Sequence, residues 1–323
     1  MALPIASLSL DLDNKWSYLK THGDPGWENF PSYLDTVVPR FVELLRSLDL
    51  MITVFVVGQD AALEKNLASL RMLAGEGHEI GNHSFRHEPW LHLYDAEAIS
   101  AELQATEEHL QRATGQRPVG FRGPGFSVSA TVLEILARRG YQYDASTFPT
   151  FLGPLARAYY FLSTRLEAGE KDRRKRLFGR FSEGFRPVKP YRWAVDGREL
   201  IEIPVTTMPI LRLPIHVSYL LYLAKFSRRL ALGYFRSALE LCRATGVPPS
   251  LLLHPLDLLD TTDAPELAFF PAMGMPAEKK RPFVAEVLRL LCDRYRIVPL
   301  REHARHAAAE LNGRAPVRLP RRA

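Results

Sequence analysis

The chain has 323 residues, of which 46% are hydrophobic and 24% charged. These values are typical of a soluble globular protein with a sizeable core, built as one large α/β domain or two smaller ones. Only two cysteines are present, Cys242 and Cys292, and neither lies in a CxxC pair. We therefore expect neither a disulfide framework nor a thiolate zinc site.

The net charge of +6 is unevenly distributed. Residues 156–192 hold eleven Lys or Arg against four acids, residues 301–323 hold six Arg against two acids, and residues 203–239 contain no acid. A run of charge is most often a solvated face. Apolar residues interleaved with Lys and Arg, as in 203–239, are also typical of a segment that rests on anionic lipid. Nucleic-acid binding is not expected, because no nucleic-acid motif accompanies the charge.

The first residues predict neither an export signal nor a membrane anchor. Residues 1–16 lack a basic region followed by a long apolar run, and no stretch of ~20 apolar residues predicts a membrane span. We therefore expect a cytoplasmic protein, with peripheral contact to the inner membrane face as the further option.

Apolar, β-rich runs alternate with helical patterns along the chain, as in a parallel sheet covered by helices. A strand at 5–12 precedes a helix from about Tyr33 to Leu48, which Pro39 either kinks or begins. The β-branched run at 51–58 predicts a buried strand. A helix at 61–75 leads into the short strand that ends before His83.

The second half of the chain continues the alternation. A helix at 95–113 is predicted to turn Leu103 and Leu110 inward and three of its glutamates, Glu102, Glu107 and Glu108, outward. Further strands are predicted at 119–122, 141–146, 199–205, 249–254 and 296–300.

Residues able to do chemistry follow the ends of these strands. In a closed β/α barrel, side chains from different strands converge at the carboxyl-terminal rim. We therefore expect these residues to form one site: Asp11, Asp13, His83, His87, Arg122, Asp144 and His254.

The spacing of His83 and His87 predicts a metal site. Two imidazoles four residues apart on a helix lie on one face and can reach one cation. Asp13 as third ligand would leave a position open for water, as in catalytic zinc sites, and the metal would lower the pKa of that water toward ~7. The segment is not HExxH, because Ser84 occupies the place of the glutamate. Two exposed helix histidines are the alternative.

Proton transfer is assigned to residues on either side of this metal. Asp11 lies two residues before Asp13 and is the expected general base, while His254 is the expected acid for the leaving atom. Arg122 can hold Asp11 ionised through a bidentate ion pair. Backbone N–H groups of residues 123–126 can face a developing oxyanion. The alternatives are a packed histidine at 254 and a turn-forming Asp144.

The motifs that carry these residues are TVFVVG, GHEIGNHSFRH, GFRGPGFS, YDAS and LLLHP. In this order they resemble the polysaccharide deacetylase family, also called the NodB-homology or carbohydrate esterase family four fold, over roughly residues 5–150 and 199–300. The resemblance implies a distorted (β/α)7 barrel that binds one divalent metal, commonly zinc, and removes N-acetyl or related groups from sugars. It assigns the base to Asp11, the acid to His254 and the third-motif arginine to Arg122. It assigns the metal ligands to Asp13, His83 and His87.

Departures from the family pattern affect the expected substrate. Leu12 separates the two aspartates, the third motif reads RGPGF, and Asp144 alone represents the fourth motif, where we count it as catalytic. We expect a barrel at 1–300 with an atypical basic insertion at 151–198, followed by a flexible tail at 301–323. Substrate contacts are expected from the oxyanion donor and three aromatic residues, namely Gly125, Phe126, Trp16 and Trp90.

The expected reaction is hydrolysis of an acetyl or formyl amide on an amino sugar. The basic segments suggest a nucleotide- or polyprenyl-phosphate-linked substrate, because phosphates are attracted to cations, and an anionic membrane surface as partner. One alternative is C–N hydrolysis of a small cyclic amide with the same metal. Another is a non-catalytic glycan- or membrane-binding barrel, although such a protein would not need the base Asp11.

Overall fold

The computed structural model describes residues 3–152, 181–195 and 197–320. Its main sheet follows the order β10-β1-β2-β3-β4-β5-β7-β6, with β11 beside β1, and every pair is parallel except β6–β7. The strands are β1 (Ile5–Leu12), β2 (Thr53–Val56), β3 (Glu79–Asn82), β4 (Gly120–Phe121), β5 (Tyr143–Asp144), β6 (Tyr191–Arg192), β7 (Ile201–Glu202), β10 (Ser250–Leu253) and β11 (Arg296–Val298).

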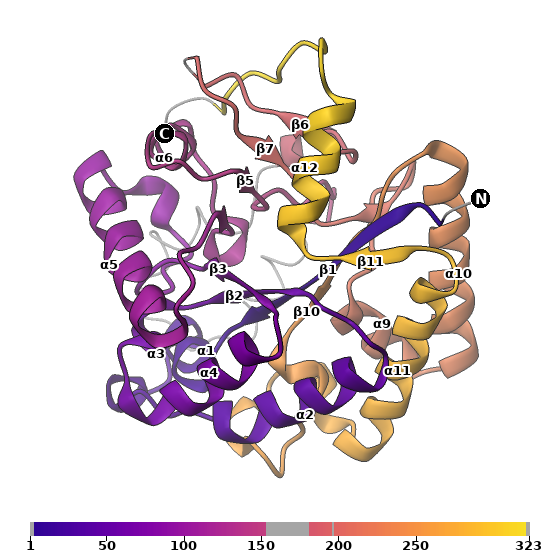
Figure 1. The fold of residues 1–323 in the computed structure, drawn as a ribbon. Helices are drawn as coiled ribbons and strands as arrows, with labels where there is room; N and C mark the ends of the chain where they lie inside the picture. Colours follow the sequence, from indigo (N-terminus) through magenta and orange to yellow (C-terminus); the bar gives the residue numbers. More distant parts are fainter. Residues whose placement is uncertain (1–2, 153–180, 196, 321–323) are drawn as a thin grey trace.

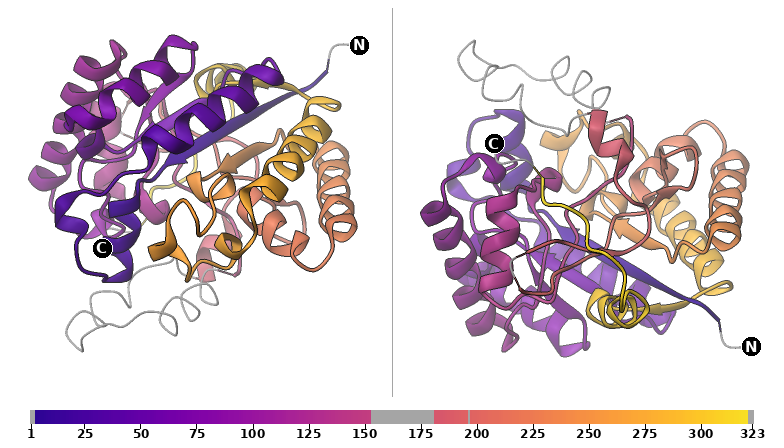
Figure 2. Two further views of the ribbon diagram at one scale, coloured as in Figure 1. Left: turned by 90° about the horizontal axis from the view of Figure 1, so that it is seen from below. Right: turned by 90° about the horizontal axis from the view of Figure 1, so that it is seen from above.

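The sheet curls into a distorted barrel. The amide of Thr206, just after β7, donates to the carbonyl of Ser250 at 3.0 Å, and the amide of Ser250 donates to Thr206 Oγ1 at 2.7 Å. These two bonds join the far edge of the sheet to β10. Helices surround the curled sheet (Figures 1 and 2). The expected fold class is therefore confirmed.

The outer helical layer is built from amphipathic segments, and Figure 1 shows α2, α4 and α5 along one side and α9, α10 and α11 along another. The helices are α1 (Lys15–His22), α2 (Leu34–Ser47), α3 (Gly58–Ala61), α4 (Leu67–Gly75), α5 (Ala96–Thr114), α6 (Ala130–Arg138), α9 (Val217–Ala224), α10 (Arg228–Thr245), α11 (Ala277–Cys292) and α12 (Leu300–Glu310). A small hairpin, β8 (Thr207–Met208) with β9 (Leu213–Pro214), precedes α9.

Strand β1 illustrates how the sequence places the site. Successive side chains of a strand point to opposite faces. Leu8, Leu10 and Leu12 are fully buried in the main hydrophobic cluster with residues of α2 and α11. The intervening Ser9 and Asp11 are also buried, but they contact Arg122 on the other face. Each face of β1 is thus covered, one by helices and the other by the polar interior.

One helix prediction differs from the structure: the segment 61–75 is split into α3, a short 3-10 turn at Glu64–Asn66 and α4. The helix expected from about Tyr33 to Leu48 is confirmed as α2, which begins at Leu34, so Pro39 lies inside it and does not mark its start.

The prediction of a flexible tail from residue 301 is wrong for its first part. Helix α12 packs Leu300, Ala304 and Ala307 into a cluster with Phe55 and other buried residues, because their i, i+4, i+7 spacing forms an apolar stripe. Its amides at 300 and 301 bond to Thr53 Oγ1 and Glu79 Oε2 at the first residues of β2 and β3. The helix therefore contacts the end of the barrel opposite the strand ends that carry the chemistry.

Most of the predicted basic insertion, residues 153–180, lies outside the described residues, as does residue 196. The expectation of a basic surface over 156–192 is therefore untested there. Within the described ranges, no helix has the length and apolar character needed to cross a membrane.

Candidate metal centre and active site

Asp13, His83 and His87 come together in the folded chain. One potential ligand atom from each lies within 4.8 Å of the others. Asp13 Oδ1 is 3.2 Å from His83 Nε2 and 2.9 Å from His87 Nε2. All three side chains are buried. The end of β1 and the segment after β3 meet here because β1–β2 and β2–β3 are neighbouring parallel pairs.

The donor set fits a divalent metal. His83 Nδ1 lies 2.7 Å from the carbonyl of Arg122, which can only accept, so Nδ1 carries the hydrogen and Nε2 is left with a lone pair. Asp13 Oδ1 is buried and receives no aligned hydrogen bond despite its two imidazole neighbours. Burial alone would raise the pKa of Asp13, but the charge of His87 and the closeness of both imidazoles hold it well below its usual value. An ionised carboxylate beside two imidazole nitrogens is a set that zinc accepts.

The expectation that the two histidines share a helix is wrong. Residues 83–88 form a loop, in which Ser84 and His87 adopt positive φ angles of 60° and 52°. Asn82 Oδ1 accepts the amide of Ser84 at 2.8 Å and starts this turn. Such backbone conformations cost about 1–2 kcal/mol per residue and persist where the surroundings impose them.

Glu102 of α5 is one of the residues that impose this conformation on the loop. Its Oε2 accepts the amides of Phe85 and Arg86, each at 2.9 Å. The prediction that Glu102 and Glu107 face outward is therefore wrong: both are buried, and Glu107 pairs with Arg139. Of the three glutamates predicted to face outward, Glu108 alone is exposed. A sequence pattern could have indicated that Glu102 is buried. Glu102 shares a helix face with Ile99 and Thr106, at i, i+3 and i+7.

Arg122 contacts Asp11 as predicted. Its Nη1 lies 2.6 Å from Asp11 Oδ1 and 2.9 Å from Ser9 Oγ, and its Nε donates to the carbonyl of Ala145 at 2.9 Å. The guanidinium is fully buried over the ring of Phe55, at 4.4 Å from its centroid. The ion pair uses Nη1 alone, whereas we expected a bidentate pair. A buried charge needs such a partner, so removing either member would leave the other uncompensated.

The turn after Arg122 uses most of its own amides. The Gly123 amide donates to Ser146 Oγ at 2.8 Å, and the Phe126 amide donates to the Gly123 carbonyl at 2.9 Å. A Cβ at Gly123 would lie 2.1 Å from the Ser127 carbonyl oxygen, so only glycine fits. Pro124 has no N–H. The exposed Gly125, at φ 58°, therefore supplies the one amide of this described turn that no described hydrogen bond uses.

His254 is held by Asp257, three residues further along the chain, and by Ser218, which no motif indicated. Its Nδ1 lies 3.2 Å from Ser218 Oγ, whose hydroxyl donates to Asp257 Oδ1 at 2.7 Å. Asp257 Oδ2 also accepts the backbone amide of His254 at 2.8 Å. Asp257 closes the short LLLHPLD segment, but Ser218 comes from α9 and lies 36 residues away in sequence. Ser218 orients the imidazole and leaves Nε2 as its other polar atom.

Asp144 is buried and paired with Glu202, a residue that sequence reasoning missed. Burial raises the pKa of Asp144, and burial together with the charge of Asp144 raises that of Glu202 well above its usual value. Asp144 Oδ1 accepts from Ser146 Oγ at 2.5 Å, and Ser146 in turn accepts the Gly123 amide. Asp144 thus acts on the Gly123 turn through Ser146.

The three aromatic residues expected to contact the sugar differ in their exposure to solvent. Trp16 is 1% exposed and donates its indole N–H to Asp60 Oδ1 at 2.9 Å, so the expectation that it stacks on a sugar is wrong. Trp90 is partly exposed and donates to Tyr94 at 3.3 Å. Phe126 is partly exposed and stacks on Phe148, with ring centroids 5.0 Å apart. Trp90 and Phe126 remain candidates for substrate contact.

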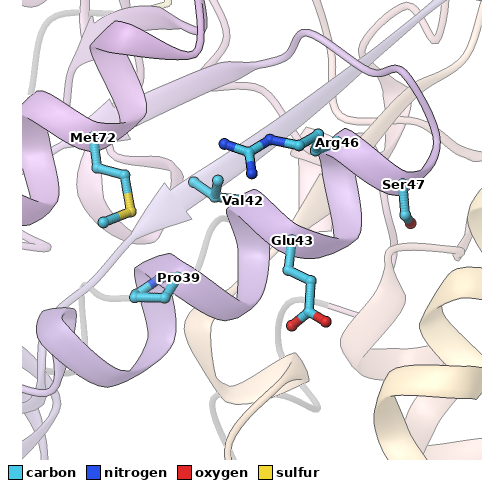
Figure 3. Close-up of a pocket in the computed structure, with 6 residues that line it drawn as sticks. All are labelled: Pro39, Val42, Glu43, Arg46, Ser47 and Met72. Carbon is cyan, nitrogen blue, oxygen red and sulfur yellow. The ribbon is translucent and has the colours of Figure 1, made fainter.

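Two surface hollows among the described residues lie away from this cluster. One, of about 490 Å³, lies along the outer surface of α2 beside Met72 of α4 (Figure 3). Its lining residues are Pro39, Val42, Glu43, Arg46, Ser47 and Met72. None of them belongs to the predicted site, and the Arg46–Glu76 ion pair already neutralises the charge at its edge.

A curled parallel barrel carries an Asp-His-His cluster beside a buried Arg–Asp pair, which makes its strand ends a candidate metal site. Residues 24–143 match the model of the family described as polysaccharide deacetylase, which confirms the family resemblance over that stretch. The match includes His83, His87 and Arg122, and it excludes Asp11, Asp13 and His254.

Individual relatives agree with this assignment. The chain is 32% identical over 120 residues to the peptidoglycan-N-acetylmuramic acid deacetylase PdaA of Bacillus subtilis, covering 37% of this chain and 42% of the relative. The chain spans less than half the length of the curated relatives it matches.

Solved structures match over nearly the whole length. A Mycobacterium smegmatis protein described as a polysaccharide deacetylase has a TM-score of 0.60 at 19% identity, covering 96% of both chains. The Puue allantoinase structure has a TM-score of 0.58 at 15% identity, covering 95% of this chain and 91% of the other. These likenesses show the fold, and the same fold is therefore used by proteins with differently named activities.

Proposed function

We propose that the protein is a metal-dependent hydrolase that removes an N-acetyl or N-formyl group from an amino sugar. The observation that carries the proposal is the convergence of Asp13, His83 and His87 within 4.8 Å. The family match and the named deacetylase relatives support the substrate class. A divalent ion held by these ligands, with zinc as our choice, supplies Lewis-acid polarisation and favours ionisation of water.

The residues around the ligands have separate roles in this proposal. Asp11, paired with Arg122, accepts the proton of the attacking water. The Gly125 amide donates to the amide oxygen of the substrate as that oxygen gains charge. His254, oriented by Ser218, gives a proton to the leaving nitrogen. Asp144 is a positioning residue for the turn that carries Gly125.

The test separates metal binding from proton transfer. Metal content is measured by mass spectrometry after dialysis, and deacylation is followed as loss of one acetyl or formyl mass from candidate sugars. Asp13→Asn, His83→Ala and His87→Ala are expected to lose the metal. Asp11→Asn is expected to keep it while activity falls ~10²-fold or more. The exposed Asp49→Asn is the matched control.

Each alternative gives a different result. Stoichiometric metal in both histidine variants would show that the ligands are misassigned. Full metal with no activity on any N-acyl sugar, but turnover of a cyclic amide, would favour the other hydrolase. A metal-free wild type that still binds glycan would favour the non-catalytic barrel.

We further propose that the substrate is phosphate-linked and that an anionic membrane surface is a partner. The support comes from the bend between α9 and α10, where Phe226 is 75% exposed and Tyr222 and Leu230 are also exposed. Lys225 and Arg229 are exposed beside them, in the stretch that contains no acid. Apolar and cationic side chains together favour the interface of an anionic bilayer.

Vesicle flotation tests the membrane partner. Wild-type protein is expected to float at low salt with vesicles that contain anionic lipid, and the double variant Phe226→Ser, Leu230→Ser is expected to stay in solution. Met51→Ser, at a separate exposed methionine, is the control. Equal flotation of the double variant, or none by wild type, would remove this part of the proposal. Activity on soluble, nucleotide-linked and polyprenyl-phosphate-linked sugars is compared in the same preparations.

A further inference from the structure

The turn that leads from β1 into α1 carries Asp13, and the side chain of the next residue, Asn14, is fully hydrogen-bonded. Asn14 is buried and caps α1, with its Oδ1 accepting the amides of Lys15 at 2.8 Å and Tyr33 at 3.2 Å. Its Nδ2 donates to Ser32 Oγ at 2.9 Å and to a carboxyl oxygen of α3. All four hydrogen-bonding positions of this amide are therefore used.

Asp60 of α3 supplies that carboxyl oxygen. Its side chain is fully buried, and its Oδ1 accepts Asn14 Nδ2 at 2.7 Å, Trp16 Nε1 at 2.9 Å and Asn66 Nδ2 at 3.0 Å. A buried acceptor that gathers three N–H donors makes its surroundings rigid, because a shift of one group disturbs every bond. Helix α3 follows β2, the neighbour of β1, so Asp60 fixes Asn14 relative to the adjacent strand end.

Tyr33 contacts the main chain of Asp13 itself. Its hydroxyl donates to the Asp13 carbonyl at 2.6 Å, and the residue is 3% exposed. On the other side of Asp13, Leu12 pairs with Val56 of β2 in the sheet. The main chain is thus held both before and after Asp13, in the position that brings its Oδ1 within 3.2 Å of two imidazole nitrogens.

We propose that Tyr33 and Asp60 are positioning residues that aim Asp13 at the candidate metal, Tyr33 through the Asp13 carbonyl and Asp60 through Asn14. This inference rests on the proposed function and names residues that act on the same site from behind it. Neither residue belongs to the Asp-His-His set. Partners that orient metal ligands in this way commonly change metal affinity 10–100-fold when they are removed.

Two buried tyrosines give a matched comparison. Tyr33 and Tyr295 are each 3% exposed, and their hydroxyls donate to main-chain carbonyls, that of Asp13 in one case and that of Leu239 in the other. Leu239 belongs to α10 in the outer helical layer. We expect Tyr33→Phe to lose about tenfold in zinc affinity, the lower end of the range above, measured by competition with a chromogenic chelator. Tyr295→Phe should bind zinc as wild type does.

Substitutions at Asp60 test the bond to Asn14. Asp60→Ala removes the acceptor of three buried N–H groups, whereas Asp60→Asn keeps an oxygen that can accept at the same place. We expect zinc affinity to fall at least about tenfold in the alanine variant and to recover in part in the asparagine variant.

The absorption spectrum of bound Co²⁺ separates positioning from stability. Cobalt accepts nitrogen and oxygen ligands, and its visible bands depend on their identity and geometry. A displaced Asp13 carboxylate should change the position or intensity of these bands in Tyr33→Phe and in Asp60→Ala. Tyr295→Phe should keep the wild-type spectrum even if its melting temperature falls.

The failures are distinguishable. Wild-type protein that binds neither zinc nor cobalt, or that deacylates no N-acyl sugar, overturns the proposed function. Metal-binding wild type, together with wild-type affinity and spectrum in Tyr33→Phe, overturns the positioning role alone. Equal losses of affinity in Tyr33→Phe and Tyr295→Phe assign the effect to general destabilisation and overturn that role as well. The tyrosine comparison decides the matter even if Asp60→Ala fails to fold, because Tyr33→Phe removes a single oxygen atom.

Discussion

Two histidines of the site are oriented in the same way, through their Nδ1 atoms. His83 donates to the Arg122 carbonyl, and His254 lies against the Ser218 hydroxyl, which is itself bonded to Asp257. In each case the partner of Nδ1 sets the orientation of the ring and whether Nε2 carries a lone pair or a hydrogen toward the centre of the site. At the residue scale, function therefore depends on groups that never touch a substrate.

Ser218→Ala tests this dependence. Removing the hydroxyl frees the His254 ring and breaks its link to Asp257, so we expect kcat to fall roughly tenfold, the lower range for lost orienting partners. KM and metal content should change little, because Ser218 contacts no ligand in the described structure. The pH profile of kcat should also shift, which simple destabilisation would not cause. The control is Ser237→Ala, at an exposed serine of α10. An unchanged kcat and pH profile in Ser218→Ala would contradict a positioning role for Ser218.

His303 gives a pH-dependent prediction about stability. Burial, followed by the charge of His306, lowers its pKa to about 4 in the folded protein, while Nδ1 contacts Ser7 Oγ at 2.8 Å. Between the unfolded pKa of ~6.5 and the folded value, the unfolded chain binds more protons, so the free energy of unfolding falls as pH falls. The loss approaches roughly 3 kcal/mol at pH 4, at 1.36 kcal/mol per unit.

His303→Asn keeps a polar atom near Ser7 and removes the titration. Chemical unfolding of both proteins from pH 7 to pH 4 is the measurement. The variant should show the flatter decline, and parallel curves would contradict the assignment to His303.

At the scale of elements, the loop 83–88 depends on helix α5. A single carboxylate oxygen of Glu102 satisfies two of its amides and supports a backbone with two residues at positive φ. Asn82 at the end of β3 accepts only the Ser84 amide, so Glu102 supplies the acceptor for the next two amides of the loop. The candidate metal ligands are therefore positioned by packing of α5 against β3 and α3.

Glu102→Ala should consequently weaken metal binding although Glu102 is no ligand. We expect a 10–100-fold loss of affinity, measured by competition with a chromogenic chelator, and a lower melting temperature. Glu108→Ala on the exposed face of the same helix is the matched control. Equal affinity in the two variants would show that the loop holds its shape without Glu102.

At the scale of the whole molecule, the proposed metal links the end of β1 to the loop after β3. A ligand that binds only the folded state adds stability that grows with its concentration, about 2.7 kcal/mol at one hundred times Kd. We expect zinc to raise the melting temperature of metal-free wild-type protein and to leave Asp13→Asn unchanged. Scanning fluorimetry with and without zinc measures both. An equal rise in the melting temperature of Asp13→Asn would show that zinc binds at another site.

The strands that follow one another along the chain, and the chemical groups at their ends, could be predicted from the sequence. Periodicity and apolar runs located β1, β2 and β10, because these strands are long or largely apolar. Asp11, Asp13, His83, His87 and Arg122 were found because each follows a strand, and parallel strands bring such positions together.

Only the tertiary structure decided how those groups are held. The histidine loop, the Ser218–Asp257 link and the buried faces of Glu102 and Glu202 depend on contacts between segments far apart in sequence, which no local period records. The burial of Trp16 beneath Asp60 and the docking of α12 under β2 and β3 have the same origin. A short-range pattern shows which side chains are available, whereas burial and hydrogen-bond partners are set by whichever distant segment packs against them.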